Sequence, residues 1–95
     1  MTVYGEMRVA KFARKHAAAR KPLARFLAIV RQATWRHFPE VMQSFAATDY
    51  VPATQLLIFD IGGNRYRLIA RVDFELQTML VRAVMTHEQY NRETL

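Results

Sequence analysis

The strongest constraint on the fold of this 95-residue chain is the alternation of residue types over residues 56–90. Residues two apart share one face of a β-strand. In the middle of this stretch, alternate residues are apolar, namely Tyr66, Leu68, Ala70, Val72 and Phe74. The residues between them are mainly polar: Arg65, Arg67, Ile69, Arg71 and Asp73. The stretch therefore predicts a meander of three β-strands with an apolar core face and a basic face.

The first hairpin of the meander is expected at residues 62–64, Gly-Gly-Asn, because these residue types tolerate the positive φ of a tight turn. This turn would place Leu57 and Phe59 on the core face. It would place Asp60 on the face of Arg67.

A turn over residues 75–78 is expected to close the second hairpin. It would join four apolar pairs: Phe74 with Met79, Val72 with Val81, Ala70 with Ala83, and Leu68 with Met85. On the other face, the same register would set Arg71 opposite Arg82 and Arg67 opposite Thr86. Like charges directly opposite each other are destabilising, so we expect an anion between or above the two arginines.

Two amphipathic helices are predicted ahead of the meander. The first covers residues 7–18, where four residues follow the spacing of one helix face: Val9, Phe12, Ala13 and His16. Pro22 suits the first turn of the second, over residues 22–33. Its buried stripe is expected to comprise Leu23, Phe26, Leu27, Val30 and Thr34. Such helices can cover one face of a three-stranded sheet, so the predicted fold is α+β, in a single domain over residues 1–95.

The remaining segments are shorter. Residues 1–6 are expected to form a strand or an arm, a helix is expected to begin at Phe38, and residues 49–54 are expected to form a loop. Trp35 is interpreted as a packing residue rather than a platform for base stacking. A short final helix is predicted from Thr86 to about Arg92, with Thr86 and Gln89 forming a capping box.

The basic residues are concentrated in the N-terminal third of the chain. Up to His37 there are nine Lys or Arg and one acidic residue, a balance of +8, and the remainder has five bases and seven acids, a balance of −2, which gives the net charge of +6. This asymmetry favours a polyanionic partner, either a nucleic acid or an acidic protein. A solvated basic helix face is the structural alternative for each of these residues.

Composition excludes several kinds of chemistry. The chain has no cysteine, which excludes disulfides, thiol catalysis and thiolate metal sites. The three histidines are scattered and Ser44 is the single serine, so neither a metal site, another cofactor nor a Ser-His-Asp triad is expected. No apolar run is long enough to span a bilayer, and the N-terminus lacks the apolar region of a signal peptide. The expected location is the cytoplasm, with no contact with a membrane.

One polar cluster remains on the basic face and in the segment that closes it: Arg65, Arg67, Arg71, Arg82, His87 and Tyr90. Cleaving RNA without a metal requires a base for the 2′-hydroxyl, a cation for the phosphorane and an acid for the departing 5′-oxygen. A guanidinium binds two phosphate oxygens and keeps its charge, which indicates phosphate binding by Arg67 and Arg82. His87 and Tyr90 are then the candidates for proton transfer, in either order. In the structural alternative, His87 buttresses the last helix and Tyr90 packs on the sheet.

Two strings in this region resemble the core of the HigB-type toxins of bacterial type II toxin–antitoxin systems. They are IFDIGGNRYRL at residues 58–68 and VRAVMTHEQY at residues 81–90. The family pattern is roughly F-x-I-x-G-N-x-Y-R-L followed by a Y-I-R strand and a T-H-x-x-Y ending. The matching residues are Asn64, Tyr66, Arg67, Arg82, Thr86, His87 and Tyr90. The resemblance covers most of the chain from the second helix onward.

The resemblance implies a RelE/ParE-like fold and a ribosome-dependent mRNA endonuclease that needs no metal. Together with the charge pattern, it indicates catalysis by Arg67, Arg82, His87 and Tyr90. It also indicates RNA contacts by Asn64, Arg65, Arg71, Lys11 and Arg14. The implied partners are the ribosome, mRNA and a HigA-like helix-turn-helix antitoxin, with operator DNA contacted only through the antitoxin.

Two other functions remain open at this point. ParE-like relatives with the same fold act as non-catalytic poisons of a protein target such as gyrase, and fold alone does not separate the two activities. An RNA-binding module without catalytic activity is the third possibility. The basic N-terminal helices would contact ribosomal RNA or dock the antitoxin, and the second role predicts an acidic patch on the antitoxin.

Overall fold

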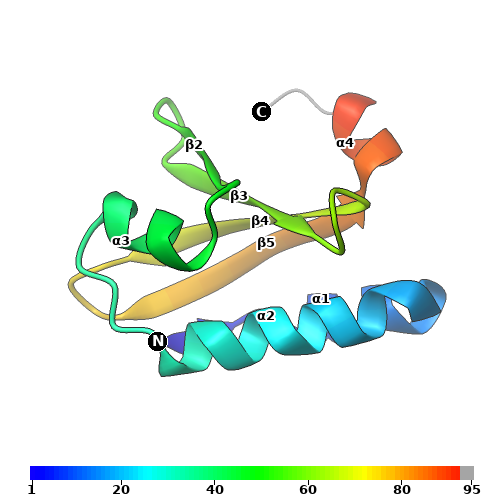
Figure 1. Ribbon diagram of the computed structural model, residues 1–95, viewed down its shortest axis with the longest axis horizontal. Helices are drawn as coiled ribbons and strands as arrows, with labels where there is room; N and C mark the ends of the chain where they lie inside the picture. Colours follow the sequence, from blue (N-terminus) through cyan, green and yellow to red (C-terminus); the bar gives the residue numbers. More distant parts are fainter. Residues whose placement is uncertain (93–95) are drawn as a thin grey trace.

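Figure 1 shows the computed structural model, which describes residues 1–92 as a twisted sheet with helices packed against it. The elements in chain order are β1 (Thr2–Tyr4), α1 (Glu6–Lys15), a 3₁₀ turn η1 (Ala17–Ala19), α2 (Arg20–Gln32), α3 (Phe38–Ser44), β2 (Asp49–Val51), β3 (Leu56–Ile61), β4 (Tyr66–Asp73), β5 (Thr78–Thr86) and α4 (His87–Arg92). The strands form one sheet in the order β1-β5-β4-β3-β2. α1 and α2 lie next to each other against one face of this sheet, and α4 follows the end of β5 (Figure 1). The fold is therefore α+β, as predicted.

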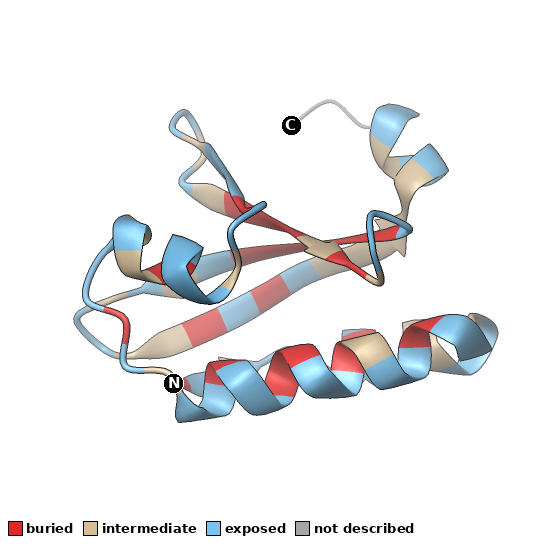
Figure 2. Ribbon diagram, viewed as in Figure 1, coloured by how far each residue is buried: buried red, intermediate tan, exposed pale blue. Residues whose placement is uncertain are grey.

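The apolar stripes of the two long helices face the sheet, and Figure 2 shows the buried segments along α2. Four residues of the predicted α2 stripe are buried: Leu23, Phe26, Leu27 and Val30. In α1, Val9 is buried, and Phe12 and Ala13 pack against the same core. Full burial of one such apolar side chain contributes about 1.5–3 kcal/mol, so the stripes hold both helices on the sheet. Thr34 is the exception, because α2 ends at Gln32 and Thr34 is exposed.

The helix boundaries differ from the predicted ones at several ends, and α2 begins at Arg20, two residues before the predicted start at Pro22. α1 ends at Lys15, earlier than predicted, because His16 leaves the helical conformation at φ −128° and ψ 83°. Pro22 lies in the first turn of α2. Trp35 is 4% exposed, and its Nε1 donates to Oγ of Ser44 at 3.0 Å, which confirms that it is a packing residue. No helix within residues 1–92 is long and apolar enough to cross a membrane.

The first hairpin forms as predicted. Leu57 and Phe59 are buried on the core face, and Asp60 pairs with Arg67 on the opposite face. The loop at residues 62–65 contains three residues with positive φ: Gly62 at 65°, Gly63 at 63° and Asn64 at 78°. The turn chemistry read from the sequence therefore determines which side chains reach each face of β3 and β4.

The register predicted for the second hairpin is wrong, and none of the four predicted apolar pairs forms. The observed pairs on the core face are Val72 with Met79, Ala70 with Val81, and Leu68 with Val84. The turn occupies residues 74–77, one residue earlier than predicted. Asp73 stabilises it, since its Oδ1 accepts a hydrogen bond from the backbone N–H of Leu76 at 2.9 Å. Gln77 ends the turn with a φ of 55°.

A bulge in β5 places Arg82 outside its predicted pair. Ala70 pairs with Val81 while the preceding residue, Ile69, pairs with Ala83, so Arg82 is one extra residue in the strand. Period-2 alternation cannot continue through such a residue. Two further predicted pairs are therefore wrong: Arg71 lies opposite Leu80 instead of Arg82, and Arg67 lies opposite Met85 instead of Thr86.

The sheet has five strands rather than three, because two short segments add an edge strand at each side. β1 runs parallel to β5, which resolves the choice between a strand and an arm. β2 pairs antiparallel with β3, so the loop predicted for residues 49–54 is wrong over Asp49–Val51. Gly5 joins β1 to α1 with a φ of 86°, and a Cβ there would lie 2.7 Å from the carbonyl oxygen of Val81. Glycine is therefore required at this junction.

Candidate active site

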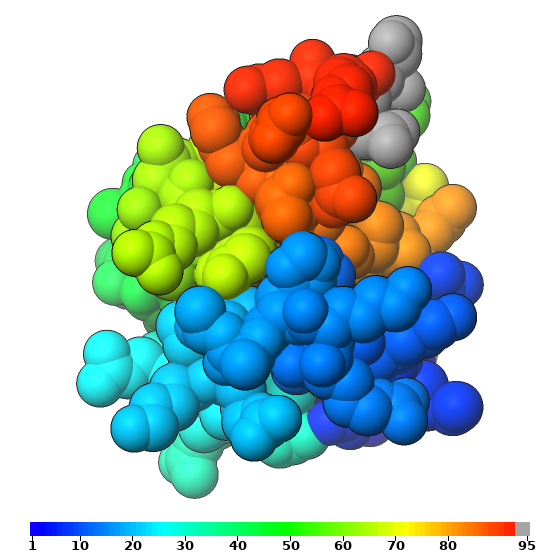
Figure 3. All heavy atoms as spheres, turned by 90° about the vertical axis from the view of Figure 1, so that its right-hand side faces the viewer, coloured from blue at the N-terminus to red at the C-terminus, as the bar shows by residue number. Residues whose placement is uncertain are grey.

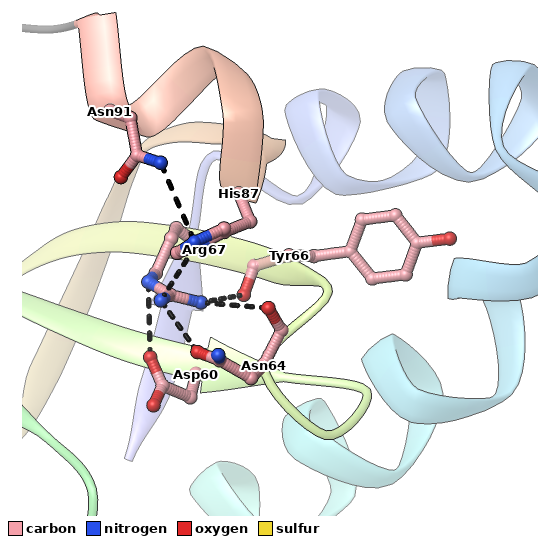
Figure 4. A network of polar contacts seen from close by, with 6 residues as sticks. All are labelled: Asp60, Asn64, Tyr66, Arg67, His87 and Asn91. Atoms are coloured by element: carbon pink, nitrogen blue, oxygen red, sulfur yellow. Dashed lines mark hydrogen bonds and ion pairs between the residues drawn. The ribbon is translucent and has the colours of Figure 1, made fainter.

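Arg67 lies at the centre of the site, on β4, with a side chain that is 9% exposed (Figure 4). Its Nε forms an ion pair with Oδ1 of Asp60 at 3.1 Å. Its Nη1 donates to the backbone oxygens of Asn64 and Tyr66 at 3.3 and 3.2 Å. Its Nη2 lies 2.6 Å from Oδ1 of Asn64 and 2.8 Å from Nδ1 of His87. A guanidinium has five N–H donors, and these contacts occupy all of them.

His87 is the first residue of α4, and two sets of contacts fix its place. Its backbone N–H donates to the carbonyl oxygen of Arg65 at 2.8 Å, which ties the start of α4 to the β3–β4 loop. The predicted capping box is confirmed. The backbone N–H of Thr86 donates to Oε1 of Gln89 at 3.0 Å, and the N–H of Gln89 donates to Oγ1 of Thr86 at 3.1 Å.

The contact with Arg67 determines which nitrogen of His87 can carry a proton. A guanidinium can only donate, so Nδ1 of His87 accepts the hydrogen bond from Nη2 of Arg67. A neutral imidazole in this arrangement carries its proton on Nε2. Nε2 is 3.4 Å from Nδ2 of Asn91, one turn later on α4. Rotating the side-chain amide of Asn91 by half a turn would exchange its nitrogen and oxygen, so that the oxygen would accept a hydrogen bond from the Nε2–H of His87.

Tyr90 completes the cluster from the next turn of α4. The Cζ of Arg67 is 5.5 Å from the centroid of its ring, within the range of a cation–π contact. Tyr90 and His87 are both half-buried and three residues apart, which places them on one side of the helix. Three of the four predicted catalytic residues therefore meet.

Arg82 lies elsewhere. It lines a pocket of about 280 Å³ between α1 and β5, together with Arg8, Lys11 and Lys15. The β5 bulge accounts for this difference, because the predicted register would have set Arg82 on the face of Arg67.

The residues predicted to bind RNA also lie in different places, some near Arg67 and some away from it. Asn64 contacts Arg67 directly, and Arg65 is exposed in the same loop. Arg71 is exposed four residues farther along β4, about 13 Å away at the usual rise of a strand, and its Nη2 donates to the carbonyl oxygen of Thr54 at 2.9 Å. Two others lie on α1: Lys11, which lines the pocket with Arg82, and Arg14, which is exposed.

Two residues of the site were not predicted from the sequence, although the sequence pattern contained an indication of each. Asp60 is the cross-strand partner of Arg67, and the predicted first hairpin already placed it on that face. Asn91 follows His87 by four residues, the spacing of neighbours on one helix face. Within residues 1–92, no three His, Asp or Glu side chains converge in a way that could hold a metal ion.

Comparison with models of protein families matches residues 19–93 to the family described as HigB_toxin, RelE-like toxic component of a toxin-antitoxin system. Among curated proteins, the chain is 47% identical over 34 residues to the mRNA interferase toxin HigB of Escherichia coli strain K12. The same identity is found with the mRNA interferase HigB of Escherichia coli O157:H7 and of Shigella flexneri. Each match covers 36% of this chain and 33% of the relative, so the match spans about a third of the length of each curated relative.

Proposed function

The chain belongs to the HigB family of RelE-like toxins, the toxic components of toxin–antitoxin systems, and from this membership we propose that it is an endoribonuclease that cuts mRNA on the ribosome. The observation that carries the proposal is the contact of Arg67 with both His87 and Tyr90. The names of the curated relatives, which describe mRNA interferases, support the same substrate class. This activity would place the protein in the cytoplasm.

The reaction that fits this cluster uses the 2′-hydroxyl of the RNA. The 2′-oxygen attacks the adjacent phosphorus and loses its proton to a base, while the bond from phosphorus to the 5′-oxygen breaks and that oxygen takes up a proton. The products are a 2′,3′-cyclic phosphate and a 5′-hydroxyl. Stabilising the phosphorane requires a fixed positive charge close to it.

Arg67 supplies that charge in the proposal. The N–H groups of Arg67 are already hydrogen-bonded within the protein. Arg67 therefore acts by orienting His87 and by the electrostatic field of its charge, which stabilises the phosphorane in a partly desolvated site. A phosphate oxygen can also replace Oδ1 of Asn64, since Asn64 is exposed. This exchange would give Arg67 the phosphate contact expected from the sequence.

The two proton-transfer candidates then have different roles. Because Nδ1 of His87 accepts from Arg67, His87 is neutral and uses its Nε2–H as a hydrogen-bond donor to the phosphorane or to the departing 5′-oxygen. It keeps this proton, and the departing 5′-oxygen takes up its proton from water. Tyr90, whose ring lies by the guanidinium, is the residue left to take the proton of the 2′-hydroxyl, which it would do in its phenolate form. Arg65 and Arg71, both exposed, would bind neighbouring phosphates. Arg82, Lys11 and Arg14 have no step in this mechanism because of where they lie.

Family membership implies a cognate antitoxin. We propose that it is of the HigA-like helix-turn-helix type, and that this toxin reaches operator DNA only through it. A non-catalytic poison of a protein target remains the alternative function, and mapping the 5′ ends of transcripts after induction separates the two. New ends within coding sequences support the nuclease. A block of growth without new ends, accompanied by DNA damage, would contradict it.

A further inference from the structure

A second group of cations gathers away from Arg67, in the pocket of about 280 Å³ between α1 and β5. Its rim carries four basic residues, Arg8, Lys11, Lys15 and Arg82, and its floor consists of Phe12, Ala83 and Val84. No acidic residue in the described part of the chain, residues 1–92, lines it. Among residues 1–92, none of the four cations is in an ion pair. This set of residues is called the α1–β5 groove below.

Two local features bring these charges together. Arg8, Lys11 and Lys15 follow the spacing i, i+3, i+7 and therefore share one face of α1. α1 packs along β5, where the bulge at Arg82 provides the fourth cation. Like charges held close together repel each other, and no acidic side chain among the described residues of the lining offsets them, which indicates an anionic partner.

The floor of the groove indicates what kind of anion this is. A nucleic-acid backbone needs cations but no apolar surface, and bases need a free aromatic face. Phe12 offers no such face, because its ring stacks on His16 with centroids 4.2 Å apart, and Tyr66 makes an edge contact at 5.6 Å. An apolar floor with a basic rim fits a peptide segment that has apolar anchors flanked by carboxylates.

We propose that the α1–β5 groove docks an acidic, amphipathic segment of the cognate antitoxin. This inference rests on the family membership, which implies an antitoxin, and does not depend on RNA cleavage. Figure 3 shows α1 in blue below α4 in red on one side of the molecule. An antitoxin bound in the groove would therefore lie beside the Arg67 site and would block access to the ribosome without filling the site.

The test compares two double variants of the purified toxin. R8E/K15E reverses two cations of the rim that have no role in the proposed cleavage. R14E/R20E reverses two exposed cations nearby that do not line the groove, and it changes the net charge by the same amount. Affinity for the purified cognate antitoxin is measured by isothermal titration calorimetry, and folding is checked by circular dichroism.

R8E/K15E is expected to bind the antitoxin roughly tenfold or more weakly, since close charge pairs across an interface contribute strongly to affinity. R14E/R20E is expected to bind within about twofold of the wild-type protein. Unchanged affinity of folded R8E/K15E would overturn the proposal, and so would an equal loss in both variants. Loss of ribosome binding with unchanged antitoxin affinity would assign the groove to RNA instead. A wild-type protein that fails to cut mRNA would leave these affinities, and this inference, unaffected.

Discussion

Nη2 of Arg67 lies 2.8 Å from Nδ1 of His87, and a guanidinium cannot accept a hydrogen bond. This one contact determines the side of the imidazole that faces the substrate. It leaves Nε2 as the nitrogen that can reach a phosphate or a leaving oxygen. The catalytic roles expected of His87 and Arg67 follow from this arrangement.

Replacing His87 by glutamine or by asparagine distinguishes the role of its Nε2 from the role of its Nδ1. Glutamine can present an N–H near the place of Nε2, whereas asparagine reaches only the place of Nδ1. We expect His87→Ala and His87→Asn to lower the single-turnover rate of cleavage of ribosome-bound mRNA by about 10²–10³-fold. His87→Gln is expected to retain clearly more activity than either. Equal rates for the glutamine and alanine variants would show that donation from Nε2 is not the role of His87.

Arg67→Lys tests whether charge alone is sufficient. Lysine keeps the charge but cannot contact Asp60, Asn64 and His87 together, because it lacks the planar fork of arginine. We expect Arg67→Lys to lose nearly as much cleavage as Arg67→Ala. Arg67→Ala should also lower the free energy of unfolding by about 1–3 kcal/mol, measured by urea denaturation, because the buried carbonyl oxygen of Tyr66 and the partly buried Asp60 lose their donor. Near wild-type cleavage by Arg67→Lys would contradict the positioning role.

Arg82→Ala distinguishes the sequence-based prediction from the observed placement. The resemblance to the family indicated a catalytic arginine, whereas the structure sets Arg82 in the α1–β5 groove. We expect the variant to cleave ribosome-bound mRNA within about threefold of the wild-type rate. A loss of about a hundredfold or more in a folded variant would return Arg82 to the catalytic set.

Gly5→Ala tests the junction between β1 and α1. The added Cβ would lie 2.7 Å from the carbonyl oxygen of Val81, and φ is 86°, so we expect a loss of about 2–4 kcal/mol in the free energy of unfolding. Gly63→Ala is the matched control, because Gly63 also has a positive φ, of 63°, but a Cβ there would meet nothing within 4 Å. The control is expected to lose only about 1 kcal/mol. Equal losses would mean that the contact with Val81 relaxes freely.

Local patterns in the sequence were sufficient for the helices and the first hairpin. The stripe of α2 and the Gly-Gly-Asn turn depend on residues close together in the chain, so periodicity and turn chemistry identify them. The same reasoning found the capping box of Thr86 and Gln89. It also placed His87 and Tyr90 near Arg67.

Features that depend on which strands pair with each other could not be predicted from the sequence. The bulge at Arg82 adds one residue to β5, and nothing in the local alternation marks it. β1 and β2 are three residues each, too short for a periodic pattern, and they are strands because β5 and β3 offer free edges. Asp60 and Asn91 gain their place in the site only when Arg67 and His87 meet across the fold.

The most direct test of the central claim is cleavage of a defined mRNA on purified ribosomes, read by mapping the new ends. The wild-type protein is expected to produce ends with a 2′,3′-cyclic phosphate and a 5′-hydroxyl, and folded His87→Ala and Tyr90→Phe variants are expected to produce them at least about a hundredfold more slowly. An intact mRNA after incubation with the folded wild-type protein would contradict the account. Unchanged cleavage by both variants would contradict the site.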